Sequence, residues 1–113
     1  MMTNNTCDIE KDELAGRKTL PVLLGREKAT KLYVFLVRLW HVSLLILPLI
    51  TVGVIGLISP VFVFFAARVD FALLKAAVLD KEHRITAMKT IGRANLHANG
   101  CYVIMYLVFA ICL

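Results

Sequence analysis

Charged residues are scarce in this chain, and they are missing altogether from two long stretches. Only 19% of the 113 residues are Asp, Glu, Lys or Arg, whereas 59% are hydrophobic. A typical soluble domain has about 25% charged and about 45–50% apolar residues. Residues 39–67 and 94–113 contain none of these four charged residue types. This composition excludes a soluble enzyme with an appended anchor, because so short a chain cannot hold both a large soluble core and a membrane region.

Cysteine is also rare, and its spacing lacks any pattern of a structural site. The three cysteines have neither a CxxC pair nor a Cys/His spacing, which excludes a disulfide framework and a zinc site; they are Cys7, Cys101 and Cys112. No basic leader followed by an apolar run opens the chain, so we expect no signal peptide. Internal repeats and low-complexity segments are absent as well.

The positive charge is concentrated rather than spread over one surface. The net charge is +5, with seven of the 13 basic residues in residues 1–38 and the other six in residues 68–93. Basic blocks that flank uncharged stretches are typical of the cytoplasmic loops of membrane proteins. The pattern therefore predicts the lipid bilayer as a partner and argues against nucleic acid.

Residues 29–67 are apolar apart from Lys31 and Arg38, and this run is too long for a single span, since about 20 residues cross the hydrocarbon. Two arrangements compete: one span over residues 39–67, or a helical hairpin. Only the hairpin puts both basic blocks on the cytoplasmic side, so it is favoured. It would turn among helix-interrupting residues, namely Pro48, Gly53, Gly56, Ser59 and Pro60.

The expected fold is thus an all-α membrane protein in the cytoplasmic membrane. A cytoplasmic segment, residues 1–28, precedes a three-helix transmembrane region, residues 29–113, with the amino terminus inside and the carboxyl terminus outside. Residues 80–93 are expected to form a charged connection. The three spanning helices are predicted at about residues 29–50, 56–78 and 94–113.

The polar segment at the start of the chain carries the only recognisable chemistry. Asn4, Asp8 and Asp12 follow at intervals of four, so on a helix they form one polar stripe. Two carboxylates and an amide suit Mg²⁺, which combines a few such ligands with water and phosphate oxygens. Gly16 is expected to end this helix, and Arg17 and Lys18 follow it where a metal-bound diphosphate would extend. By spacing alone, the acidic pair is more typical of a solvated helix face than of a metal site.

The segment Asn4–Gly25 reads NNTCDIEKDELAGRKTLPVLLG. It resembles the second aspartate-rich motif of the UbiA superfamily of intramembrane prenyltransferases. The similarity is greatest to the 1,4-dihydroxy-2-naphthoate polyprenyltransferase branch, whose motif is NN-x-R-D-x-x-x-D-x-x-x-G-K-x-T-L followed by V-x-L-G. The matching positions are Asn4, Asn5, Asp8, Asp12, Gly16, Thr19, Leu20, Val22, Leu24 and Gly25, with Arg17 as the basic residue.

The resemblance implies Mg²⁺-dependent transfer of a polyprenyl group from its diphosphate to an aromatic acceptor. In the branch concerned, this acceptor is 1,4-dihydroxy-2-naphthoate, on the route to menaquinone. The implied roles are catalytic metal–diphosphate ligands for Asp8 and Asp12, amide contacts for Asn4 and Asn5, and diphosphate contacts for Arg17 and Lys18. The resemblance thus implies magnesium as the cofactor, and the polyprenyl diphosphate and the aromatic acceptor as the ligands.

Two departures from the family stand out. The family has Arg before the first Asp of the motif, where this chain has Cys7. The family's first motif, N-x-x-x-D-x-x-x-D, has no counterpart here, so the chain resembles a carboxyl-terminal fragment that needs an amino-terminal half as partner. The alternative function is a small membrane protein that only binds partners, or an inactive remnant of such an enzyme. A transporter fragment would leave the motif unexplained.

Other polar residues have structural as well as functional interpretations. Arg38 either lines the bundle interior or extends to the interface, while Trp40 and His41 are expected to pack. Asn95 and Asn99 share a helix face and are expected to bond to a neighbouring helix or to contact the acceptor. Four bases of the second basic block are interpreted as topology determinants, namely Lys75, Lys81, Arg84 and Lys89.

Overall fold

The computed structural model describes residues 1–112, apart from the side chains of Phe62 and Ala66. Residues 1–112 contain helices and no β-strand, which confirms the expected all-α class for this part of the chain. The elements in chain order are α1 (Met2–Cys7), α2 (Ile9–Leu14), α3 (Leu20–Leu24), α4 (Arg26–Val52), the 3₁₀ turn η1 (Gly53–Leu57), α5 (Ile58–Phe62), the π-helical turn η2 (Val63–Ala67), α6 (Arg68–Lys75) and α7 (Arg84–Cys112).

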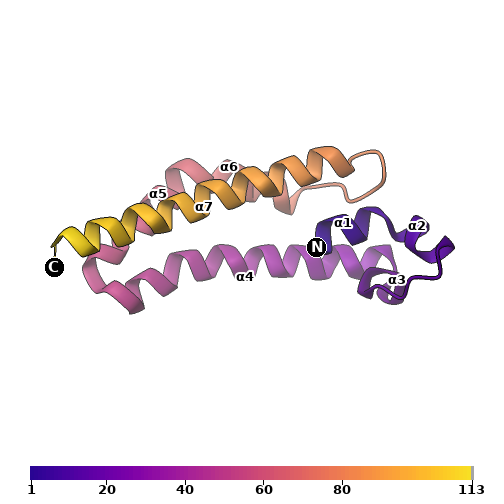
Figure 1. Cartoon of the computed structure of the whole chain (residues 1–113), viewed down its shortest axis with the longest axis horizontal. Coiled ribbons are helices and arrows are strands. Elements are labelled where there is room, and N and C mark those ends of the chain that lie inside the picture. Colours follow the sequence, from indigo (N-terminus) through magenta and orange to yellow (C-terminus); the bar gives the residue numbers. More distant parts are fainter. Residues whose placement is uncertain (113) are drawn as a thin grey trace.

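The molecule is a rod of 55 × 22 × 19 Å. Figure 1 shows α4 along one side and α5, α6 and α7 along the other, with α1, α2 and α3 gathered at one end. The carboxyl end of α7 lies at the opposite end of the rod. Because residues 39–67 and 94–112 carry no Asp, Glu, Lys or Arg, the rod has a charged end, which holds the motif, and an uncharged end.

The chain reverses direction at η1. Gly53 ends α4 with a positive φ of 61°, a conformation that glycine adopts without strain. Pro48, expected near the turn, instead stays inside α4 and is buried. Gly56 approaches the Pro48 carbonyl so closely that an added Cβ would collide with it. The close approach of these two backbones therefore sets the geometry of the reversal.

Replacing Gly56 with alanine is expected to destabilise the fold by about 1–3 kcal/mol, because the new methyl group would overlap backbone atoms that cannot move independently. Thermal unfolding in detergent micelles, followed by circular dichroism, measures this loss. Gly92→Ala is the matched control: nothing lies within 4 Å of a Cβ built there, and alanine favours the helix. Equal effects of the two substitutions would contradict the close-packing explanation.

The return from the turn differs from the prediction of one helix over residues 56–78. The described backbone passes through α5, the π turn η2 and α6, and it leaves helical structure after Lys75. The charged connection predicted for residues 80–93 is also wrong over most of its length, because α7 already begins at Arg84. Lys, Arg, Ala and Met are good helix formers, so a high charge does not by itself prevent a helix.

Asp80, four residues before the first residue of α7, is hydrogen-bonded to the turn that leads into this helix. The Asp80 carboxylate accepts hydrogen bonds from the His83 backbone N–H at 2.8 Å and from its Nδ1 at 2.7 Å. Both bonds lower the pKa of Asp80, and the bond from the backbone N–H has the larger effect. The aspartate thus satisfies a donor at the helix entrance, which explains why α7 extends back toward the charged end.

Two helical stretches are long and apolar enough to cross a membrane, namely Arg26–Phe65 and Arg84–Cys112. In both, most of the apolar window is exposed, with only 28% and 17% of it buried. The first stretch contains α4 and continues through the turn that follows it. The return segment is therefore not found as a separate membrane-length helix, and a third span remains a prediction. The predicted end of the last helix at residue 113 lies outside the described residues.

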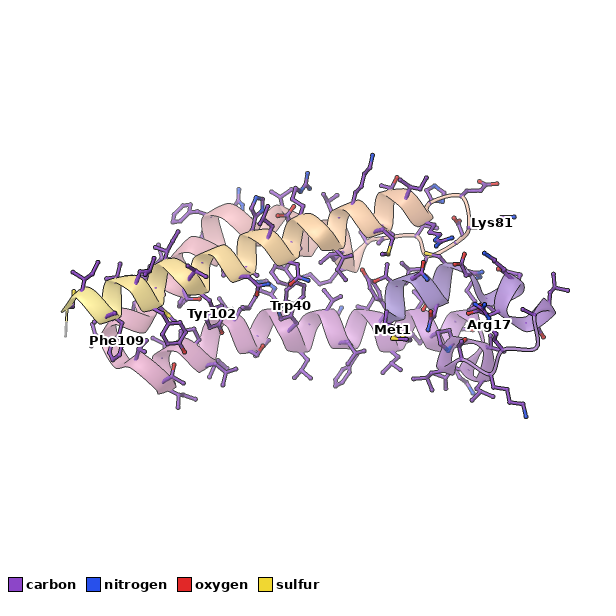
Figure 2. All side chains as sticks on the ribbon, viewed as in Figure 1. Met1, Arg17, Trp40, Lys81, Tyr102 and Phe109 are labelled. Carbon is purple, nitrogen blue, oxygen red and sulfur yellow. The ribbon has the colours of Figure 1, made fainter. Side chains whose placement is uncertain are left out.

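Polar and aromatic side chains join the three long segments midway along the rod (Figure 2, near Trp40). Phe71 of α6 is fully buried, with the His41 ring stacked on it at 4.3 Å and the Trp40 ring edge-on at 4.9 Å, both measured between centroids. The predicted packing role of these two α4 residues is thereby confirmed. Next to Phe71, buried Asp70 accepts hydrogen bonds from α7, at 2.6 Å from Arg93 Nε and at 2.5 Å from His97 Nδ1.

Three other polar residues lie differently from expectation. Asn99 donates to Asn95 at 3.1 Å on the exposed face of α7, so these amides bond to each other rather than to a neighbouring helix. Arg38 is exposed on α4 and does not line the interior of this bundle. Helix–helix bonds are made instead by Arg93 and His97, polar residues at the same end of the predicted last helix, which both bond to Asp70 of α6.

Candidate functional site

The polar stripe predicted at the amino terminus is present. Asp8 separates α1 from α2, yet the backbone bonds continue across it, with the Asp8 N–H donating to Asn4 O at 3.1 Å and the Asp12 N–H to Asp8 O at 2.9 Å. These bonds have helical spacing, so Asn4, Asp8 and Asp12 remain on one face. Both aspartates are buried, at 9% and 5% exposure. Burial of two neighbouring carboxylates requires positive partners.

Arg84, at the first position of α7, binds the first two residues of the stripe, Asn4 and Asp8. Its Nε donates to Asn4 Oδ1 at 2.9 Å, and its Nη1 lies 3.2 Å from Asp8 Oδ2. One guanidinium therefore bridges an amide and a carboxylate that are one helical turn apart. The sequence-based interpretation of Arg84 as a topology determinant missed this contact. A stripe with two acids requires a cation nearby, but nothing local in the sequence indicates which of the 13 basic residues supplies it.

The end of the stripe has the predicted stop signal. The Gly16 N–H donates to Glu13 O at 3.0 Å, and the Arg17 N–H donates to Asp12 O at 2.8 Å. With the positive φ of Gly16, 67°, this is a Schellman motif, so the prediction that Gly16 ends the helix is confirmed. Side-chain Nη1 of Arg17 also pairs with Asp12 Oδ1 at 3.5 Å.

The predicted substrate contacts are only partly gathered. Arg17 reaches the stripe through Asp12, although its side chain is 69% exposed. Lys18 is exposed and makes no ion pair with any residue in the range 1–112. Asn5 is half-buried on α1. Arg17 thus remains close to the carboxylates, whereas the structure brings neither Lys18 nor Asn5 into contact with them.

Arg26 ties the motif segment to the rest of the chain. From the first position of α4 it donates to the backbone carbonyls of Thr6 (3.2 Å) and Leu79, and it pairs with Glu10 at 2.6 Å. The hydrogen bond from Arg26 lowers the pKa of Glu10. Nearby Cys7 is fully buried, and burial raises the pKa of its thiol. The Cys7 side chain therefore lies inside the protein and not at its surface.

A cavity of about 620 Å³ opens beside Asp8 at the charged end of the rod. Its polar lining contains four basic side chains and a single carboxylate, and the apolar remainder comes from the first turns of α7. The lining residues are Asp8, Lys11, Lys81, Arg84, Ile85, Met88 and Lys89. Lys81, labelled in Figure 2, lies at the end of the rod where the motif segment and the connection before α7 meet. A cavity of this charge is suited to an anion.

The residues present fit a magnesium ion only in company with an anion. No group of three or more His, Cys, Asp or Glu that could hold a metal occurs among the described residues. Mg²⁺ commonly binds through one or two carboxylates, with water and substrate phosphates completing its shell. Asp8, Asp12 and the Asn4 amide are donors of that kind, and Asp8 opens directly onto the basic cavity, but in this structure all three are bound to Arg84 or Arg17. The chemistry of the donor set is thus consistent with a metal–phosphate site and not with a closed structural metal site.

The site therefore combines a carboxylate stripe, an arginine that bridges it, and a basic cavity, all at the charged end of an apolar helical rod. In comparisons with protein-family models, curated proteins and solved structures, nothing matched this sequence.

Proposed function

We propose that this chain carries one half of the active site of a UbiA-type prenyltransferase. The reaction is Mg²⁺-dependent transfer of a polyprenyl group from its diphosphate to an aromatic acceptor, of which 1,4-dihydroxy-2-naphthoate is the first candidate. The observation that supports it most is the intact stripe of Asn4, Asp8 and Asp12, with Asp8 lining a basic cavity. A solvated helix face would need neither buried carboxylates nor a bridging arginine.

In this proposal each residue of the stripe has a separate task. Asp8 and Asp12 hold the magnesium, and Asn4 orients Asp8 through their shared partner Arg84. A magnesium ion bound there would neutralise the negative charge on the departing diphosphate. Arg17 lies against Asp12 and limits how far that carboxylate can turn. The buried setting strengthens every one of these charge interactions relative to water.

The proposal includes a location in the cytoplasmic membrane. The uncharged end of the rod lies in the bilayer, and the charged end with the motif lies at its cytoplasmic face. Three spans are proposed: α4, the return through α5 and α6, and α7. The exposed apolar surface supports this placement, since less than a third of either membrane-length window is buried by the chain itself.

The test is a transfer assay in membranes that contain this chain together with a protein bearing the motif N-x-x-x-D-x-x-x-D. We expect prenylation of 1,4-dihydroxy-2-naphthoate that requires added Mg²⁺ and stops with a chelator, and none from this chain alone. 4-Hydroxybenzoate serves as the competing acceptor. Absence of transfer to either acceptor in every combination would favour the alternative, a membrane protein that only binds partners.

A further inference from the structure

Two side-chain amides in the uncharged part of α7 have no hydrogen-bond partner on another helix. Asn99 donates to Asn95 at 3.1 Å, and neither side chain forms a further hydrogen bond with any residue that the structure describes. His97, which lies between them in sequence, is by contrast bound to Asp70 of α6. A side-chain amide has two N–H groups and a carbonyl oxygen. The mutual bond therefore leaves N–H groups on both asparagines, and the Asn99 oxygen, to be satisfied from outside the chain.

The two amides lie in Arg84–Cys112, a helix long and apolar enough to cross a membrane. Asn99 follows the last charged side chain, Arg93, by about 9 Å along the helix axis, at about 1.5 Å per residue. An amide without partners is costly in hydrocarbon, whereas it bonds readily to an amide of another helix. In the proposed membrane location, this side of α7 is therefore suited to contact with protein and not with lipid.

The amides belong to a regular row of residues on one side of α7. Its members are alternately four and three residues apart, which is the spacing of helices that pack side by side with a repeat of 3.5 residues. Each member is exposed or, like Tyr102 (labelled in Figure 2), half-buried. The neighbouring row, with Leu96, Val103 and Leu107, is exposed and wholly apolar. We call the first row the amide face, and its members are Met88, Gly92, Asn95, Asn99, Tyr102 and Tyr106.

The chemistry of the amide face selects its partner. An asparagine side chain is both donor and acceptor, so an identical amide satisfies it, whereas an apolar helix cannot. Two copies of one chain have the same orientation in a membrane, because the same basic blocks determine it. Their α7 helices are then parallel, and each residue of the amide face meets its own counterpart. In parallel helix pairs, asparagine at such a position fixes the register and the number of helices.

We propose that the amide face of α7 binds the same face of a second copy of this chain, which gives a parallel dimer with two-fold symmetry. Hydrogen bonds between the two Asn95 side chains, and between the two Asn99 side chains, hold the copies in register. This inference uses the proposed membrane location, but it requires neither magnesium nor the proposed reaction.

Sedimentation equilibrium of the full chain in mild detergent micelles, at several ratios of protein to detergent, measures the dissociation constant of the dimer. Asn95→Leu/Asn99→Leu is expected to raise this constant about tenfold, because the bonds across the interface are lost while the helix is kept. Thr86→Leu/Thr90→Leu is the matched control. It also replaces two polar side chains four residues apart in α7, but on the opposite side of the helix, and is expected to change the constant by no more than about twofold.

Disulfide cross-linking in membranes tests the same geometry with both asparagines in place. In a Cys112→Ser background, which removes the exposed native thiol, Tyr106→Cys places a thiol on the amide face and Val103→Cys places one on the apolar row. A disulfide forms only between cysteines whose Cα atoms come within about 7 Å. Mild oxidation is therefore expected to give a covalent dimer with Tyr106→Cys and little or none with Val103→Cys.

Several results would overturn the dimer. A wild-type chain that is monomeric at every detergent ratio would do so, as would equal dissociation constants for the two double variants or equal cross-linking at positions 103 and 106. Co-expression with a protein that bears the motif N-x-x-x-D-x-x-x-D distinguishes the other occupant: loss of the Tyr106→Cys dimer there would assign the amide face to a helix of that protein. A dimer that persists while no prenyl transfer is detected would support this inference and reject the proposed function.

Discussion

Replacing Asp8 or Asp12 with asparagine is expected to lower the rate of prenyl transfer at least about a hundredfold in the assembled membrane system. Asparagine has nearly the same shape and can still accept a hydrogen bond from Arg84 or Arg17, but it lacks the negative charge that binds a divalent cation. Loss of one group that stabilises transition-state charge typically reduces rates by about a hundredfold to a thousandfold. Asp8 should show the larger effect, since it also lines the basic cavity.

Glu13→Gln is the matched control for these two variants. Glu13 follows Asp12 in α2, is exposed, and forms no ion pair with any residue from 1 to 112. Initial rates at several magnesium concentrations distinguish a weakened metal site from a misfolded protein, because excess Mg²⁺ partly restores only the former. Full activity of either Asp variant would show that the stripe is an ordinary helix face.

Replacing Arg93 with glutamine is expected to lower the free energy of unfolding by about 3 kcal/mol. The Asp70 side chain is only 3% exposed, so without Arg93 its carboxylate would keep His97 as its sole ion-pair partner among the described residues. A buried charge that loses a partner is strongly destabilising. The value is placed at the low end of the usual range because the Arg93 side chain is itself 52% exposed.

A double-mutant cycle identifies the pair directly. Asp70→Asn combined with Arg93→Gln removes both charges and is expected to be more stable than the Arg93 variant alone, since no unpaired carboxylate remains. Arg68→Gln, on the exposed side of α6, serves as control and is expected to change stability by no more than about 0.5 kcal/mol. Unfolding in mixed micelles with increasing denaturant provides the free energies. Additive effects of the two substitutions would show that Asp70 and Arg93 do not interact.

Local features of the sequence were good guides to local structure. Gly16 ends the motif helix as its spacing predicted, and the apolar run after Arg26 forms α4. Both depend on residues close in sequence: a positive φ that suits glycine, and a continuous stretch of helix-compatible side chains. Pro48 shows where such reasoning fails. It is a helix breaker by local rules, yet it stays within α4 because tertiary packing against Gly56 overrides propensity.

Contacts between distant segments were not predictable from the pattern. Arg84 and Arg93 are two bases among several in one block, and only the packing of α7 against α1 and α6 assigns each of them an acid. The same holds for Asp70, which is an isolated acid in the sequence and a buried one in the fold. Hydropathy locates the apolar stretches but does not specify the partner of each charged side chain at their borders.

The hydrogen bond between Asn4 and Arg84 joins residues 80 positions apart, and this separation has a consequence for biosynthesis. Asn4 and Asp8 leave the ribosome early, whereas the arginine that fixes them is translated only after α4, α5 and α6. Until then, the two motif helices, each of six residues, are too short to hold their shape alone in water. The fixed geometry of the stripe therefore arises only after α7 has been translated and its first turn docks on α1.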